Sequence, residues 1–161
     1  MANFRIDDLT AADPLTGAEL VEVEQDDSGL KNRKTTVQAI AGLAPAEIGV
    51  ACSDESTAID TTGTKVTFRM PYAMTVTDVR ASLTGATTTG TLTVDINEGG
   101  TSILSTKLTI DATDKTSETA GTEVVISDAA LADDAEITVD VDDTGDDTAT
   151  GLKVWIIGTR A

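Results

Sequence analysis

The sequence predicts a mainly β protein: an antiparallel β-sandwich of jelly-roll-like type, preceded by a small N-terminal arm, a β-hairpin and a short helix. From about residue 56 the chain is rich in Thr, Val and Ile, which favour strands over helices. Several short alternating segments follow, separated by turn signals, a pattern typical of sandwiches. The 161 residues allow one ordinary domain plus an appendage, and we expect these at residues 47–161 and 1–46.

The first 46 residues are too few to bury a core of their own. Residues 1–18 carry turn signals and little periodicity, so we expect an extended arm. An alternating segment, a turn at residues 26–29 and a basic segment predict a hairpin. Residues 37–43 present an apolar face with helical spacing and predict a short helix. Residues 44–50 are then the expected link to the second part.

The second part has seven expected strands, and their alternation predicts one face on a core and one in solvent. The alternation is clearest at Leu92, Val94 and Ile96, whose neighbours are polar. The expected strands lie at residues 64–70, 73–83, 90–97, 102–110, 122–127, 135–142 and 151–158.

Three local features refine this expectation. The apolar phase slips within residues 73–83, which predicts a bulge near Thr77 and Asp78. Residues 97–100, Asn-Glu-Gly-Gly, read as a hairpin turn. The last strand, residues 151–158, is apolar on both faces, so it is either central in the sandwich or covered by another subunit. Because the chain is poor in aromatic residues, its core is thin, and this favours an oligomer.

Composition excludes several classes of function. The net charge of −17 repels phosphate backbones and anionic lipid, so neither nucleic acid nor a membrane is an expected partner. The chain has no histidine to activate a nucleophile, so we do not expect an enzyme. Cys52 is the single cysteine, which fits assembly in a reducing cytoplasm. No apolar segment has the length of a membrane span or the form of a signal peptide.

An acidic segment at residues 140–147 is the sharpest chemical candidate. Asp140, Asp142 and Asp143 place hard carboxylate oxygens beside a Gly turn, and calcium prefers such ligands. The spacing matches only the front of an EF-hand loop. The segment is therefore either a calcium site or a solvated acidic loop between two strands, and no other cofactor is expected.

The chain has one concentrated basic segment, formed by Lys31, Arg33 and Lys34. One interpretation is docking to an acidic surface, such as that of a neighbouring subunit. The other is that these residues balance Glu22 and Glu24 across the hairpin.

Several segments of the sequence resemble segments of virion proteins of tailed bacteriophages. The segment from Leu15 to Leu43, which contains LTGAELV and TTVQAIAGL, resembles a short module near the N-termini of such proteins. The segments KVTFRMPYAMTVTDVRASL, DINEGGTSILSTKLTID and DDAEITVDVDDTG, with the closing ATGLKVWIIGTR, are similar to a β-domain of phage structural proteins. Together these similarities cover most of the chain.

The resemblance implies a capsid decoration, or cement, protein that binds the outside of the head and bridges subunits of the major capsid protein. It also implies a homotrimer, made in the cytoplasm of the host bacterium and located on the outer capsid surface. The alternative is a short head-fibre, collar or tail-attached adhesion protein whose β-domain contacts the host. The chain lacks the long shaft of a fibre, which favours decoration.

The N-terminal module would then be the attachment element. Its apolar residues are expected to contact the virion or the chain's second part, together with the basic segment; the alternative is that they pack only on the chain's own sandwich. These apolar residues are Leu20, Val21, Val23, Val37 and Ile40.

Overall fold

A computed structural model describes residue 18, residues 20–23 and 33–36, residues 40 and 42, and residues 44–161. The chain divides into two compact units, residues 1–44 and 45–161. The division lies two residues before the expected one, because strand β3 already begins at Pro45. No helix in the described part of the chain is long and apolar enough to cross a membrane.

The described strands of the first unit form an antiparallel pair. Strand β1 (Leu20–Val23) pairs with β2 (Arg33–Thr36), with Leu20 opposite Thr36 and Val23 opposite Arg33. This confirms the two strands of the predicted hairpin. The predicted turn lies outside the described residues, as do the predicted arm except Ala18 and the predicted helix except Ile40 and Gly42.

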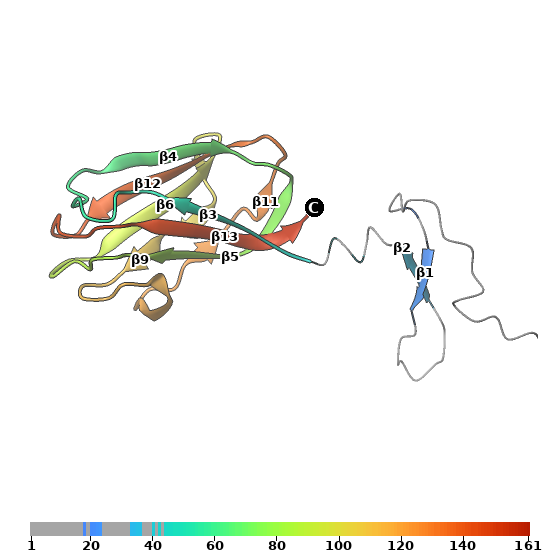
Figure 1. The fold of residues 1–161 in the computed structure, drawn as a ribbon, viewed down its shortest axis with the longest axis horizontal. Helices are drawn as coiled ribbons and strands as arrows, with labels where there is room; N and C mark the ends of the chain where they lie inside the picture. The colour runs from blue at the N-terminus through green and yellow to red at the C-terminus, as the bar shows by residue number, and fades with distance from the viewer. Residues whose placement is uncertain (1–17, 19, 24–32, 37–39, 41, 43) are drawn as a thin grey trace, which may run out of the picture. The chain divides into compact units, whose positions relative to one another are not determined.

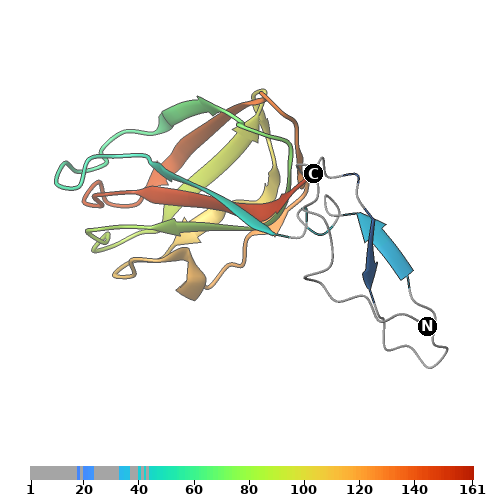
Figure 2. The same ribbon diagram turned by 45° about the vertical axis from the view of Figure 1, so that its right-hand side comes forward.

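The second unit consists of two antiparallel sheets that pack face to face, as Figure 1 and Figure 2 show. One sheet has the order β11-β5-β13-β3, and the other has the order β4-β12-β6-β7, with β9 also paired to β6. Short strands β8 and β10 form a separate pair. The bounds are β3 Pro45–Ala51, β4 Gly63–Arg69, β5 Met74–Ser82, β6 Leu92–Glu98, β7 Thr101–Ser102, β8 Leu104–Thr106, β9 Leu108–Ile110, β10 Val125–Ile126, β11 Ala130–Leu131, β12 Glu136–Thr144 and β13 Lys153–Arg160.

The strand order is that of a jelly roll. The sheet β3-β13-β5-β11 faces the sheet β4-β12-β6-β9, so consecutive strands of the chain repeatedly change sheet. Two interlocked Greek keys produce this arrangement of eight strands. The predicted fold class, an antiparallel β-sandwich of jelly-roll-like type, is confirmed.

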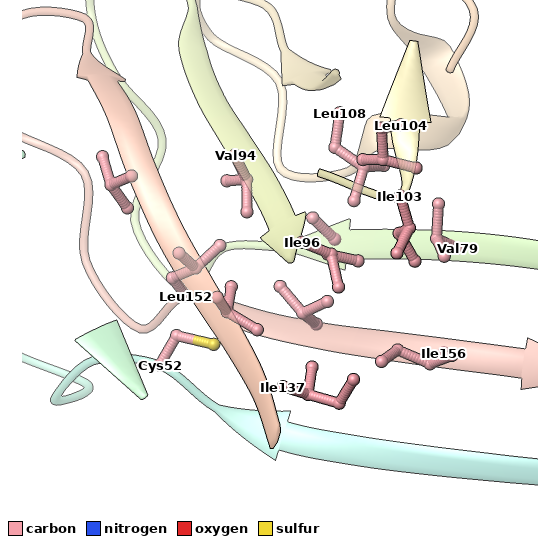
Figure 3. Packing of buried hydrophobic residues seen from close by; sticks show 14 of the residues in the cluster. Cys52, Val79, Val94, Ile96, Ile103, Leu104, Leu108, Ile137, Leu152 and Ile156 are labelled. Atoms are coloured by element: carbon pink, nitrogen blue, oxygen red, sulfur yellow. The ribbon is translucent and has the colours of Figure 1, made fainter. Parts of the chain in front are cut away.

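The core lies between the inner faces of the two sheets. Figure 3 shows Val94, Ile96 and Ile137 of the second sheet opposite Val79 and Ile156 of the first. All five are buried. The first four have polar neighbours along their strands, whereas Ile156 lies between half-buried Trp155 and Ile157. The core is aliphatic almost throughout, as the low aromatic content predicts.

Two predicted irregularities are confirmed. Across β5 and β13, Ile157 lies opposite Asp78 but Gly158 lies opposite Val76, so Thr77 is an extra residue. This is the predicted bulge, and it returns Val76 and Val79 to the same inner face. The turn between β6 and β7 has positive φ at both Gly99 (+56°) and Gly100 (+83°), the geometry of a tight two-residue hairpin.

Three expectations are wrong in detail. The expected link at residues 44–50 is mostly strand β3. The expected strand at residues 102–110 is three short strands, because the chain leaves β6 after Ser102, pairs with β10, and returns to β6 at Leu108. Of the expected strand at residues 122–127, only residues 125–126 pair with another strand. Strand β11 was not expected at all. These short strands lack the alternation that marks the long ones.

The second unit has two distinct ends. Pro45, at the start of β3, lies opposite Thr159, near the end of β13, so the chain enters and leaves at one end. Figure 1 and Figure 2 both show the C-terminus there. The opposite end, called the loop end, is formed by residues 52–62, 83–91, 111–122 and 145–152. This arrangement separates the connection to the first unit from the four loops.

Candidate interaction surfaces

The loop end is held together by Asp146. Its Oδ2 accepts hydrogen bonds from the backbone amides of Thr88 (2.9 Å) and Thr89 (2.8 Å) and from the Thr88 hydroxyl. Its Oδ1 accepts one from the Thr148 hydroxyl (2.5 Å). Because all these bonds favour the charged form, the pKa of Asp146 lies well below its ordinary value. The carboxylate therefore ties the loop at 83–91 to the loop at 145–152.

The same two loops approach each other at two glycines. Gly90 has φ of +77°, and a Cβ there would lie 3.0 Å from Cα of Gly145. Gly145 has φ of +73°. Only glycine combines this backbone conformation with such a close approach. The loop end is thus a braced surface with defined loop positions.

A second brace joins the first and last loops, where the Gly151 amide donates to the Asp54 carbonyl oxygen at 2.9 Å. Asp54 accepts hydrogen bonds from the backbone amides of Ser56 and Thr57, both at 2.7 Å, and these bonds hold the pKa of Asp54 far below its ordinary value. Glu55 forms an ion pair with Lys153 at 2.6 Å, and this contact lowers the pKa of Glu55. The carboxylates of Asp54 and Glu55 are therefore charged and already engaged by the protein.

The predicted calcium ligands are placed on β12, but they have separate partners. Asp140 Oδ2 accepts a hydrogen bond from Asn97 Nδ2 at 2.9 Å, while its Oδ1 is buried without a partner among the described residues. Asp142 forms an ion pair with Lys107. Asp143 accepts a hydrogen bond from the backbone amide of Gly145 at 2.9 Å. In the described part of the chain no group of three acidic side chains is arranged to hold a metal ion, so the calcium site stays a prediction.

The structure adds a polar network that sequence reasoning missed. Asp95 is 5% exposed, and its Oδ2 lies 3.0 Å from Lys107 Nζ. Its Oδ1 accepts hydrogen bonds from Ser102 Oγ (2.6 Å) and the Ile96 amide (2.9 Å). Lys107 also reaches Asp142, and these two carboxylates raise its pKa. The sequence carried no signal for this network, because the alternation of Leu92, Val94 and Ile96 predicts Asp95 on the solvent face.

The residues predicted for virion attachment all precede the second unit. Leu20, Val21 and Val23 lie on β1, and Arg33 and Lys34 lie on β2, with Lys34 opposite Glu22 in the register. That register is the one expected if the hairpin balances its own charges. Ile40 is 44% exposed. Lys31 and Val37 lie outside the described residues.

The basic side chains of the second unit are mostly engaged internally. Arg69, Arg80, Lys107 and Lys153 form ion pairs with carboxylates. Lys65 donates to the carbonyl oxygen of Thr61, and Arg160 lies 4.0 Å from the centre of the Tyr72 ring. The acidic residues are far more numerous, so the surface of this unit is strongly negative. Such a surface favours partners that are basic or uncharged at the contact.

One groove of about 400 Å³ opens beside β5. Its lining includes buried Val79 and Leu108 and the acidic residues Glu118 and Glu123. Arg80, next in sequence to Val79, pairs with Glu118 at 3.4 Å. The volume is within the range of small-ligand sites. Of the described surfaces, this groove is a candidate place for a ligand of the β-domain.

The lone cysteine is inert in this setting. Figure 3 shows the Cys52 sulfur pointing into the core beside Leu152. Burial raises the pKa of the Cys52 thiol to about 11, despite an opposing hydrogen bond with the Val154 backbone. The side chain is therefore a neutral thiol at neutral pH, and it packs as a small apolar group.

Comparison with known proteins gives little similarity. No protein-family model matches the chain, and no curated protein matches it. The fold is similar to a chain in the structure of infectious bursal disease virus Gx strain, with a TM-score of 0.36 and 10% sequence identity. The match covers 87% of this chain and 37% of that one. A likeness this low carries no inference about function.

Proposed function

We propose that this protein is a structural component of a tailed-phage virion, and specifically a decoration protein of the head. The observation that carries the proposal is the division of the chain into a jelly-roll body and a separate small unit with a two-stranded hairpin. A hairpin of two four-residue strands is marginal alone, so it gains stability by packing on a partner. Jelly rolls are common in proteins that build or coat virus particles.

The arrangement of the second unit supports a mechanical role. Its chain connection to the hairpin is at one end and its braced loops are at the other. In the proposed role, hairpins bind the major capsid protein, and the jelly rolls stand on the outer surface and associate with one another. Attachment at many equivalent points gives high avidity from modest individual contacts.

The acidic surface fits this position. A negative outer layer keeps particles soluble and separated, and it does not attract nucleic acid or anionic membrane surfaces. No metal or cofactor is needed for the proposed role, and no catalytic activity is assigned.

The groove beside β5 favours a second candidate, in which the β-domain is a host-contacting adhesin on a short head fibre, collar or tail. Its lining includes Glu118, in the loop at residues 111–122, and Glu123, next to that loop. The bound group would then be cationic or rich in hydroxyl groups.

Immunogold labelling of intact virions separates the two candidates. An antibody raised against residues 56–161 should label the whole head if the protein is a decoration protein. Label confined to the neck or tail would support the adhesin instead. Absence of label from purified virions, with the antigen present in the lysate, would remove both. Particles that lack the protein should also release their DNA at a lower temperature, with restoration on adding the purified chain back.

A further inference from the structure

Strand β3 has a free edge. Among the described strands it pairs only with β13, and seven residue pairs join the two without any shift of register. The Cys52 amide donates to the Leu152 carbonyl at 2.8 Å. Because hydrogen-bonded pairs alternate along an antiparallel ladder, the backbone N–H and C=O groups of the even-numbered residues of β3 point toward β13. The backbone groups of Glu47, Gly49 and Ala51 therefore point to the open side.

Apart from Pro45, the first residue of β3, this edge lacks the features that usually prevent strand addition. Exposed edge strands are commonly protected by lysines, bulges or short length. The edge strand of the other sheet, β4, has two cations, and Lys65 is an extra residue in its pairing with β12. At the opposite side of the unit, β11 has only two residues and β9 has three. Strand β3 is seven residues long and regular, and it carries a single charge, at Glu47.

The low charge of the β3 edge favours a second copy of this chain as its partner. A chain with a net charge of −17 repels other copies of itself over most of its surface. Residues 48–53 contain no charged side chain, so two copies can approach here at a low electrostatic cost. A strongly basic partner would gain little at this edge, because only Glu47 would attract it.

Apolar groups flank the edge on both faces. On the inner face, Ile48 and Val50 are half-buried against the core and so leave apolar surface at the open seam. On the outer face, Trp155, the single tryptophan of the chain, is half-buried over exposed Gly49; a Cβ at Gly49 would lie 3.0 Å from its Nε1. A partly exposed tryptophan beside an open edge is typical of a contact surface.

We propose that two copies of this chain associate by pairing their β3 edges antiparallel about a two-fold axis. Centred on Gly49, this pairing places Glu47 of each copy opposite Ala51 of the other, so the two Glu47 carboxylates are kept apart. Ile48 of each copy then neighbours Val50 of the other, and the two Trp155 side chains flank the paired glycines. The contact is isologous and joins two four-stranded sheets into one continuous sheet.

The test is the mass of the full chain in solution by light scattering and sedimentation equilibrium. We expect twice the monomer mass of 16.6 kDa. Ala51→Asp adds a charge to the contact, and Ala51→Pro removes an amide that points to the open side while leaving the β13 ladder intact. Both variants should have the monomer mass. Thr67→Asp, with the same added charge on exposed β4, should remain a dimer.

Trp155 provides a second readout. Its fluorescence emission should shift to longer wavelength on dilution of the wild-type chain, and Ala51→Asp should show the shifted emission at all concentrations. This reports the contact even if Ala51→Pro fails to fold.

A monomer mass for the wild type, or a dimer that Ala51→Asp leaves intact, overturns the proposal. A trimer mass also overturns it, and would support the homotrimer expected from the sequence. None of these results depends on where the protein sits on a virion, so the proposed function is tested separately.

Discussion

Gly158 has no space for a side chain. A Cβ at this position would lie 2.1 Å from the carbonyl oxygen of Thr75, and backbone atoms cannot move away cheaply. Gly158→Ala should lower the free energy of unfolding by about 1–3 kcal/mol, the usual range for overpacking. Gly121→Ala is the matched control, because its nearest neighbour would be Asp111 Oδ2 at 3.4 Å. Urea denaturation measures both, and equal stability of the two variants would contradict the close approach.

The Asp146 brace predicts a specific acid sensitivity. The pKa of Asp146 is lowered in the folded state, so its contribution to stability is complete above the ordinary value of 3.8 and is lost as the pH falls below it. Asp146→Asn should therefore be less stable than the wild type at neutral pH, and the difference should shrink at about pH 3. Thermal unfolding across this range is the measurement.

Asp133→Asn is the control for that experiment. Asp133 is exposed, and its carboxylate has no hydrogen bond within the described residues. Its substitution should leave the stability at neutral pH close to that of the wild type. A gap between Asp146→Asn and the wild type that stays constant from neutral to acid pH would show that the carboxylate charge does not brace the loops.

At the scale of elements, Lys107 joins β6 to β12. It lies between β8 and β9 and contacts buried Asp95 and partly exposed Asp142. Lys107→Met leaves the Asp95 carboxylate without its cation, and loss of a partner for a buried group costs about 1–3 kcal/mol. We expect the lower part of this range, because the Lys107 side chain is 41% exposed and water can replace it. Chemical denaturation should be compared with Lys115→Met.

Lys115 has no ion pair among the described residues, so its substitution should change stability little. A Lys107→Met variant as stable as Lys115→Met would mean that water alone satisfies Asp95.

The long strands were predictable and the short ones were not. Strands β5, β6 and β12 were anticipated within a few residues, because each alternates over several pairs of positions. The bulge at Thr77 was visible as a slip in the same alternation. Strand β13 was anticipated from its run of apolar residues. Strand β3 was taken for a linker, because its Ala, Gly and Pro content disguises the strand period. What makes it a strand is the ladder with β13, a partner about a hundred residues away in sequence.

At the scale of the whole molecule, the attachment role of the first unit can be tested on particles. Ile40 and Val125 are the exposed large apolar residues of the described part of the chain, at 44% and 47% exposure. Val23→Asp combined with Ile40→Asp should abolish binding to capsids that lack the protein, measured by co-sedimentation. The jelly roll should stay folded, as judged by circular dichroism.

Val125→Asp is the matched control, since it adds a charge at an equally exposed site on β10. It should bind capsids normally. Normal binding by the Val23→Asp and Ile40→Asp variant would exclude the hairpin unit as the anchor.

The candidate sites were less predictable from the sequence than the fold was. The sequence pointed to the acids of β12, yet their partners come from distant segments: Asn97 on β6 and Lys107 before β9. No spacing rule links these positions, because their proximity depends on which strands become neighbours in the two sheets. The groove beside β5 was invisible for the same reason.

The sequence by itself determined the β class, the long strands and their buried faces, the bulge, the tight glycine turn and the acidic character of the surface. These depend on local alternation and composition, which act over a few residues. The tertiary structure decided the jelly-roll order, the partner of each charged group and the free edge of β3. Those features depend on pairings between segments far apart in the chain, and the energy of such pairings is not encoded in any one segment.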